Sequence, residues 1–167
     1  MEVSIIIVNY NQKVLLLDCL RAIKKNSSGF SCEVIVVDNH SQDDSVAGVR
    51  KNFPEVELII CEQNSGFSQA NNLGARRSHG EYLLFLNNDT QVLEGSIKTL
   101  LDFLKTHPEA GLVGAKLLNP DGTSQRQGRP LIPFLESTKP LSVGFLPAAA
   151  VMMKRELFEK QIGRAHV

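Results

Sequence analysis

The sequence predicts an α/β fold in which a mainly parallel sheet carries helices on both faces. Short apolar runs alternate with amphipathic segments, an order typical of strands joined by crossover helices. The first run, residues 3–8, is rich in β-branched residues and apolar on both faces apart from Ser4, as in a central strand covered on both sides. Polar residues follow the successive runs, and ligands bind beyond the carboxyl ends of parallel strands. We therefore expect a doubly covered sheet with a site along one edge.

The first half of the chain alternates between strand and helix patterns. Leucine and isoleucine recur at steps of three and four residues over 14–25, which predicts an amphipathic helix that ends at residues 26–29. Ser41 is placed to cap the next helix. The other elements expected in this half are strands over 33–37 and 56–61 and a helix over 42–51.

The second half begins with the same alternation and then changes character. Residues 119–140 are rich in Pro, Gly, Ser and Gln, which predicts a long loop of the kind that is usually functional or mobile. Apolar character returns over 143–153, ahead of a last helix over 154–160. The elements expected before the loop are helices over 66–78 and 95–106 and strands over 81–86 and 111–117.

Composition excludes several classes of protein. The 167 residues fit one domain, and 18 basic residues balance 18 acidic ones without a basic run, so no nucleic-acid partner is expected. No apolar stretch approaches the roughly 20 residues that span a bilayer, and the first residues lack the features of a signal peptide. We expect a cytoplasmic protein, with peripheral association at the inner face of a membrane left open. Cys19, Cys32 and Cys61 form no ligand-spaced cluster and are expected to be buried thiols.

Asparagine and aspartate gather just after four successive predicted strands. Each cluster alone fits a turn or a helix cap, because these residue types favour both. One shared pocket would explain all of them together. The clusters are Asn9-Tyr10-Asn11, Asp38-Asn39-His40-Ser41, Glu62-Gln63-Asn64-Ser65-Gly66-Phe67 and Asn87-Asn88-Asp89-Thr90.

Two residues of these clusters suit a nucleobase. Asp38 follows a wholly apolar strand and could accept a hydrogen bond from a base N–H, such as N3–H of uracil or thymine, or it could cap the following helix together with Ser41. Tyr10 could lie flat against the base or close the edge of the sheet.

A third cluster suits a phosphate. Gly66 and Gly74 flank Asn71 and Asn72 on one helical segment, whose start offers free N–H groups and a positive dipole end. Close packing of small residues against the sheet is the alternative.

Asp89 is the candidate metal ligand. A buried strand delivers it to the edge of the sheet, where a divalent cation held by one carboxylate and by phosphate oxygens would stabilise a diphosphate leaving group. An N-cap or Asx-turn before Val92 is the alternative. Other nucleotide sites lack their fingerprints, because the chain has no GxGxxG, GxxxxGK[ST] or GxSxG motif. A nucleotidyltransferase would need a Gly-rich, basic loop after the first strand, where this chain has Asn9-Tyr10-Asn11-Gln12.

Together the motifs resemble those of family 2 glycosyltransferases, which have the GT-A (nucleotide-diphospho-sugar transferase) fold, and most of all the rhamnosyltransferase-like bacterial members. The resemblance covers about residues 3–163. The matching segments are Ser4-Ile-Ile-Ile-Val-Asn-Tyr-Asn11, Val36-Val-Asp-Asn-His-Ser41, Asn64-Ser-Gly-Phe-Ser-Gln-Ala-Asn-Asn-Leu-Gly74 and Gly80-Glu-Tyr-Leu-Leu-Phe-Leu-Asn-Asn-Asp-Thr90.

The resemblance implies transfer of a sugar, with inversion, from a UDP- or dTDP-sugar, dTDP-rhamnose among them, to a glycan or lipid-linked acceptor in polysaccharide or cell-wall biosynthesis. It implies Mg²⁺ or Mn²⁺ as cofactor, with Asp89 as the metal ligand. Asn87 stands where the family's Asp-x-Asp motif has its first Asp, so one carboxylate is lost. The donor-binding residues implied are Asn9, Tyr10, Asn11, Asp38, Asn39, Asn64, Gly66, Phe67, Asn71, Asn72, Asn87 and Asn88.

The resemblance also implies that this chain lacks the general base. Residues 144–158 look like a later family segment, beyond which the family places an Asp in a Glu-Asp motif, and this chain has no Glu-Asp pair. Glu156 and Glu159 are poor substitutes. We therefore expect a glycosyltransferase domain over 1–161 that is incomplete at its C-terminus, or alternatively an inactive fragment that binds nucleotide sugars. Residues 162–167 read like a translated sequencing adapter and are expected to be a non-native tail.

Overall fold

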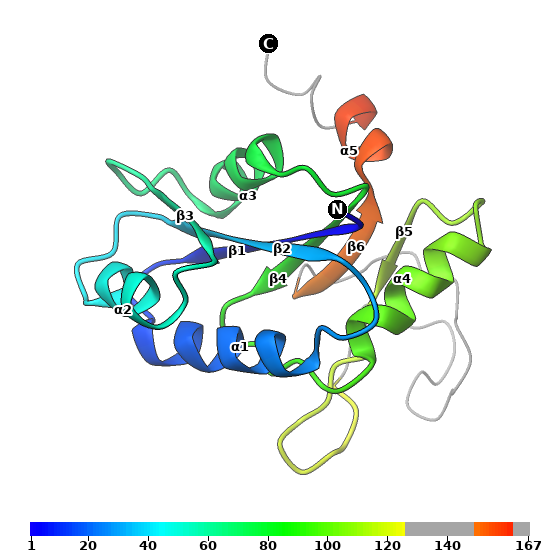
Figure 1. Cartoon of the computed structure of the whole chain (residues 1–167), viewed down its shortest axis with the longest axis horizontal. Coiled ribbons are helices and arrows are strands. Elements are labelled where there is room, and N and C mark those ends of the chain that lie inside the picture. The colour runs from blue at the N-terminus through cyan, green and yellow to red at the C-terminus, as the bar shows by residue number, and fades with distance from the viewer. Residues whose placement is uncertain (126–148, 162–167) are drawn as a thin grey trace.

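A six-stranded sheet forms the centre of the computed structural model, which describes residues 1–125 and 149–161 (Figure 1). The spatial order is β3-β2-β1-β4-β6-β5, and β1 to β4 run parallel, whereas β6 is antiparallel to both β4 and β5. The prediction of a mainly parallel sheet is confirmed. The strands are β1 Val3–Asn9, β2 Cys32–Asp38, β3 Glu57–Ile60, β4 Tyr82–Asn87, β5 Leu112–Gly114 and β6 Ala150–Lys154.

Helices cover both faces of the sheet, as the sequence predicts. Ile5 and Ile7 of β1 face one core, to which α1, α2 and α4 contribute, whereas Ile6 and Val8 face the smaller cores under α3 and α5 (Figure 1). Successive strand residues point to opposite faces, so a strand that is apolar throughout needs this double cover. The helices are α1 Lys13–Asn26, α2 Ser45–Asn52, α3 Phe67–Arg77, α4 Ser96–Thr106 and α5 Arg155–Gln161.

Three predicted elements need correction. The helix expected over 42–51 begins only at Ser45, and its N-cap residue is Asp44. Ser41 is therefore not its cap. The strands expected over 56–61 and 111–117 are both shorter in the structure.

The C-terminal part adds a strand that the sequence analysis left unassigned. Residues 150–153 of the apolar run over 143–153, together with Lys154 from the predicted last helix, form β6, which lies between β4 and β5. At the start of the predicted long loop, Leu118 and Ser124 form an antiparallel bridge. The remainder of that loop, residues 143–148 and the predicted tail lie outside the described residues. Within residues 1–125 and 149–161, no helix has both the length and the apolar character needed to cross a bilayer.

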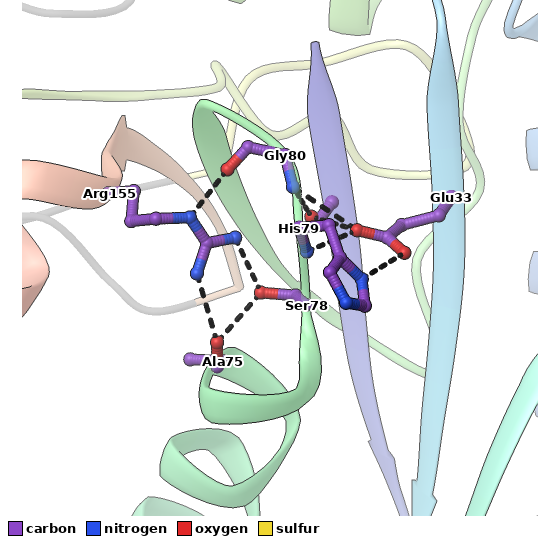
Figure 2. A network of polar contacts seen from close by, with 7 residues as sticks. Glu33, Ala75, Ser78, His79, Gly80 and Arg155 are labelled. Carbon is purple, nitrogen blue, oxygen red and sulfur yellow. Dashed lines mark hydrogen bonds and ion pairs between the residues drawn. The ribbon is translucent and has the colours of Figure 1, made fainter. Parts of the chain in front are cut away.

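Glu33 holds the connection between α3 and β4 at the amino-terminal edge of the sheet (Figure 2). Its Oε1 accepts hydrogen bonds from Ser4 Oγ at 2.6 Å, from the His79 amide at 2.6 Å and from the Gly80 amide at 3.2 Å. The Glu33 carboxylate thus provides an acceptor for two backbone amides of a connection that is not itself part of a strand.

Arg155 holds the same connection from the other side (Figure 2). Its Nε donates to the Gly80 carbonyl at 2.7 Å, Nη2 donates to Ser78 Oγ at 2.9 Å, and Nη1 donates to the Ala75 carbonyl at 3.3 Å. A guanidinium suits this place, because it offers several donors in a fixed plane and lies at the carboxyl end of α3, where carbonyls lack helical partners. Arg155 thereby ties the start of α5 to the end of α3.

We expect the Glu33→Gln variant to change how stability depends on pH. Burial alone would raise the pKa of Glu33, but hydrogen bonds from Ser4 and His79 outweigh it and lower the pKa from its usual 4.5. Because the folded state has the lower pKa, this carboxylate stabilises the fold above about pH 4.5, and the contribution is lost as pH falls further. The free energy of unfolding of the variant at pH 7 should be about 1–2 kcal/mol lower than that of wild type, as measured by urea denaturation. Between pH 5 and pH 3 it should fall less than the free energy of unfolding of wild type does. Parallel pH profiles of the two proteins would contradict this role.

Candidate functional site

The carboxyl ends of the parallel strands meet at one edge of the sheet. Asn9 pairs with Asp38 across β1 and β2, and Val8 pairs with Asn87 across β1 and β4. The Cys61 amide donates to the Asp38 carbonyl at 2.9 Å, which brings the end of β3 to the same place. Parallel register therefore gathers the four polar clusters along one edge.

Asn9 is the centre of the hydrogen bonds at this edge. Its side chain is fully buried, and its Nδ2 donates to Asp38 Oδ2 at 3.1 Å and to Ser41 Oγ at 3.1 Å. Its Oδ1 accepts from Asn88 Nδ2 at 2.8 Å. One amide thus joins the loops that follow β1, β2 and β4.

Asp38 is 1% exposed, and each carboxylate oxygen already accepts one hydrogen bond. Oδ2 accepts from Asn9, and Oδ1 accepts from the Ser41 amide at 2.9 Å. Asp38 therefore caps a local turn and not helix α2. Because a carboxylate offers about four acceptor positions, two remain for another donor.

Asn39 shapes the loop that precedes α3. Its Nδ2 donates to Asn64 Oδ1 at 2.8 Å, and its Oδ1 accepts from the Ser65 amide at 3.0 Å. Asn64 Oδ1 also accepts from the amide of Gly66 at 3.0 Å. Gly66 has φ +85°, a left-handed conformation that favours glycine. These contacts set the direction in which the chain enters α3.

The start of α3 supplies the free amides that the sequence predicts, one residue later than expected. The first helical hydrogen bond runs from the Ala70 amide to the Gly66 carbonyl at 3.2 Å. Within the described residues, the amides of Phe67, Ser68 and Gln69 have no hydrogen-bond partner. They are available to an anion.

Two aromatic side chains lie exposed in these loops. Tyr10 and Phe67 are each 47% exposed, which is a large fraction for an aromatic ring. Beside Tyr10, Asn11 has φ 53°, and its Oδ1 accepts from the Gln42 amide at 2.6 Å. Asn tolerates this backbone conformation better than most residues. The loop after β1 is thus fixed by hydrogen bonds while the Tyr10 ring remains accessible.

The interior of α3 serves packing in part. Asn71 Nδ2 donates to the Phe67 carbonyl at 3.0 Å within the helix, and Asn72 is half-buried. A Cβ on Gly74 would lie 2.6 Å from Ile6 Cγ2, so the packing interpretation holds for this glycine.

Asp89 lies exposed on the tight turn that the Thr90 amide closes onto the Asn87 carbonyl at 3.2 Å. Within the described residues its carboxylate accepts no hydrogen bond and forms no ion pair. The alternative role as a helix cap is wrong, because α4 begins at Ser96 with Gly95 as its N-cap.

The surroundings of Asp89 suit a hard cation held by a single carboxylate. Burial, and secondly the charge of Asp89, raise the pKa of the Cys19 thiol to about 12. No group of three or more His, Cys, Asp or Glu residues in the described part of the chain could hold a metal ion. Mg²⁺ commonly binds through one or two carboxylates while water and phosphate fill the other positions, and Asp89 fits that pattern.

Ser41 has a role that differs from the predicted helix cap. Its Oγ accepts hydrogen bonds from Asn9 Nδ2 and from the Asn11 amide at 2.9 Å, which ties two loops together. The Asp38-x-x-Ser41 spacing does signal a local turn, but the partners on β1 are distant in sequence. Of the three cysteines, Cys19 is buried as expected, whereas the other two are half-buried.

Comparisons with known proteins bear on what this site does. The family model described as Glycosyl transferase family 2 matches residues 4–162. An uncharacterized glycosyltransferase of Haemophilus influenzae is 30% identical over 165 residues, which cover 94% of this chain and 54% of the relative. The GalNAc(5)-diNAcBac-PP-undecaprenol beta-1,3-glucosyltransferase of Campylobacter jejuni is 29% identical over 104 residues, 60% of this chain and 33% of the relative. The chain thus spans about half or less of these relatives.

A solved structure has the same arrangement of elements. The crystal structure of residues 1–349 of S. aureus TarS superposes with a TM-score of 0.77 at 23% identity, covering 97% of this chain and 49% of that one. The same protein is known in complex with UDP and with UDP-GlcNAc. This likeness confirms the predicted GT-A fold. The chain belongs to glycosyl transferase family 2.

Proposed function

We propose that this chain forms the donor-binding part of an enzyme that transfers a sugar from a nucleotide-diphosphate sugar to a glycan or lipid-linked acceptor, with inversion. One observation carries the proposal. The hydrogen bonds from Asn88 to Asn9 and from Asn9 to Asp38 join three strand ends into one edge, beside the unpaired carboxylate of Asp89. Membership of family 2 supports a transferase as the activity of the whole protein.

For the nucleobase we propose uracil or thymine, read by Asp38. Its carboxylate has acceptor positions left and could accept the N3–H of either base, whereas N3 of cytosine carries no hydrogen to donate. The exposed rings of Tyr10 and Phe67 offer apolar faces on which a base could stack. Among donors with these bases, the rhamnosyltransferase-like motifs favour dTDP-rhamnose as the first to test.

For the diphosphate we propose two contacts. Asp89 would hold the Mg²⁺ or Mn²⁺ ion, which when bound stabilises the negative charge of the leaving diphosphate. The free amides of residues 67–69 at the start of α3 would bind phosphate oxygens. The remaining polar residues of the edge would orient the donor. They are Asn11, Asn39, Asn64, Gly66, Asn71, Asn72 and Asn87.

A second proposal concerns turnover. Glu156 is exposed and forms an ion pair with Lys160, and hydrogen bonding to that lysine lowers its pKa. Glu159 is exposed on the same helix. A general base should instead lie against the acceptor with a pKa close to the working pH. We therefore propose that the base lies outside this chain, which by itself binds the donor without transferring the sugar.

We expect base selectivity to depend on Asp38. In calorimetric titrations with Mn²⁺, wild type should bind UDP and dTDP more tightly than CDP, because cytosine has no N3–H to donate to Asp38. Asp38→Asn should weaken UDP binding by about tenfold or more, because the base then donates to a neutral amide oxygen in place of a charged carboxylate.

Asp43→Asn is the matched control. Asp43 is a neighbouring carboxylate that accepts from the Lys13 amide at 3.0 Å outside the proposed base contact. This variant should bind UDP like wild type. Equal binding of CDP and UDP by folded wild type, or unchanged binding of UDP by Asp38→Asn, would contradict the proposed role.

A further inference from the structure

The side chain of Asn9 is fully occupied inside the protein. It is 0% exposed, both hydrogens of its amide nitrogen have acceptors, and its oxygen has a donor. In the described part of the chain, Ser27 Oγ is the one buried side-chain polar atom without a partner, so no buried side-chain atom of this network lacks one. Such networks rigidify the segments they join.

The partners of Asn9 belong to the two loops on which the proposed site depends. Asp38 and Ser41 lie after β2, where the base is proposed to bind. Asn88 directly precedes the proposed metal ligand Asp89, and its Nδ2 donates to Asn9 Oδ1 at 2.8 Å. Within the described residues, no hydrogen bond joins the two loops to each other, so Asn9 is the polar bridge between them.

An amide is the group that these positions need. Asn9 must donate twice and accept once, which neither a carboxylate nor an apolar side chain can do. An Asp at this position would also place a second negative charge against Asp38. The hydrogen bonds of Asn9 therefore explain why an amide stands at position 9, which the separate sequence motifs do not show.

We propose that Asn9 and Asn88 are positioning residues. They hold the turn that carries Asp89 in a fixed position relative to the Asp38–Ser41 loop, so that one nucleotide-sugar molecule contacts both loops at once. This inference rests on the proposed function and deepens it, because it assigns Asn88 an action through Asn9 and not through the ligand.

A double-mutant cycle on UDP affinity tests the inference. UDP with Mn²⁺ is titrated calorimetrically into wild type, Asn88→Ala, Asn9→Ala and the double variant, each checked for cooperative thermal unfolding. Thr90→Ala is the matched control on the same turn, because the Thr90 side chain makes no hydrogen bond within the described residues. If Asn9→Ala does not fold, Asn9→Leu replaces it, because leucine has a similar size and likewise removes every hydrogen bond of this side chain.

Asn88→Ala should weaken UDP binding by about fivefold to thirtyfold, and Thr90→Ala should leave it unchanged. In the Asn9→Ala or Asn9→Leu background, Asn88→Ala should weaken UDP binding by less than a further twofold or so, because the connection is already broken. Multiplicative effects would mean that Asn88 touches the ligand directly and would overturn the inference while leaving the proposed function intact. Absence of UDP binding by folded wild type would overturn both.

Discussion

Asp89→Ala should abolish the effect of Mn²⁺ on UDP binding. In wild type we expect Mn²⁺ to increase the affinity for UDP by about tenfold or more, because a cation held by the carboxylate also binds the diphosphate. In the variant, the affinity for UDP should be the same with Mn²⁺ as with EDTA. The measurement is a calorimetric titration of UDP under both conditions.

The same substitution should leave folding unchanged, which separates a binding role from a structural one. Asp89 is exposed and has no hydrogen-bond partner in the described part of the chain, so its loss should change the free energy of unfolding by less than about 0.5 kcal/mol. Glu94→Ala removes another exposed carboxylate from the connection between β4 and α4 and is the control. If it reduces the Mn²⁺ effect as much as Asp89→Ala, the effect is one of general charge and Asp89 is not the ligand.

Gly80→Ala should cause the largest loss of stability among single-methyl changes, about 2–4 kcal/mol. A Cβ at this position would lie 2.5 Å from the Ser4 amide nitrogen and 2.7 Å from the Val3 carbonyl carbon. These are backbone atoms of the central strand, which cannot move aside without disturbing its pairing. The measurement is urea denaturation of variant and wild type at pH 7.

Gly48→Ala is the matched control. Its Cβ would lie 3.3 Å from Leu17 Cδ1, the end of a flexible side chain, and alanine favours the helical conformation by about 1 kcal/mol. This variant should therefore lie within about 1 kcal/mol of wild type. If both substitutions lowered the free energy of unfolding equally, the close approach of Gly80 to β1 would not be the cause of the loss in Gly80→Ala.

The central strands and the main helices could be predicted because their signals are local. Residues 3–8 are apolar on both faces and form β1 between β2 and β4. The predicted apolar side of α4, formed by Ile97, Leu100, Leu101 and Leu104, is buried throughout. The position of Asp89 followed from the strand before it, since the end of a buried strand fixes where the next residues emerge.

Other features depend on partners that are distant in sequence. Ser41 was assigned to a helix cap from its neighbours, but the amide of Asn9, 32 residues away, engages its hydroxyl. Residues 150–153 are apolar, which fits a strand or a helix equally well, and only their pairing with β4 shows that they belong to an antiparallel strand. The sequence likewise could not distinguish polar side chains that face a ligand from those, such as Asn9, whose hydrogen bonds are all made within the protein.

The central claim is that the carboxyl edge of the sheet binds the diphosphate nucleotide of a sugar donor. Its most direct test is to titrate UDP with Mg²⁺ into ¹⁵N-labelled protein and follow the amide resonances. We predict shifts confined to residues 9–11, 38–41, 64–69 and 87–89, with Glu33 and Gly80 at the opposite edge unaffected. Saturable shifts centred elsewhere, or none in a folded sample, would contradict the account.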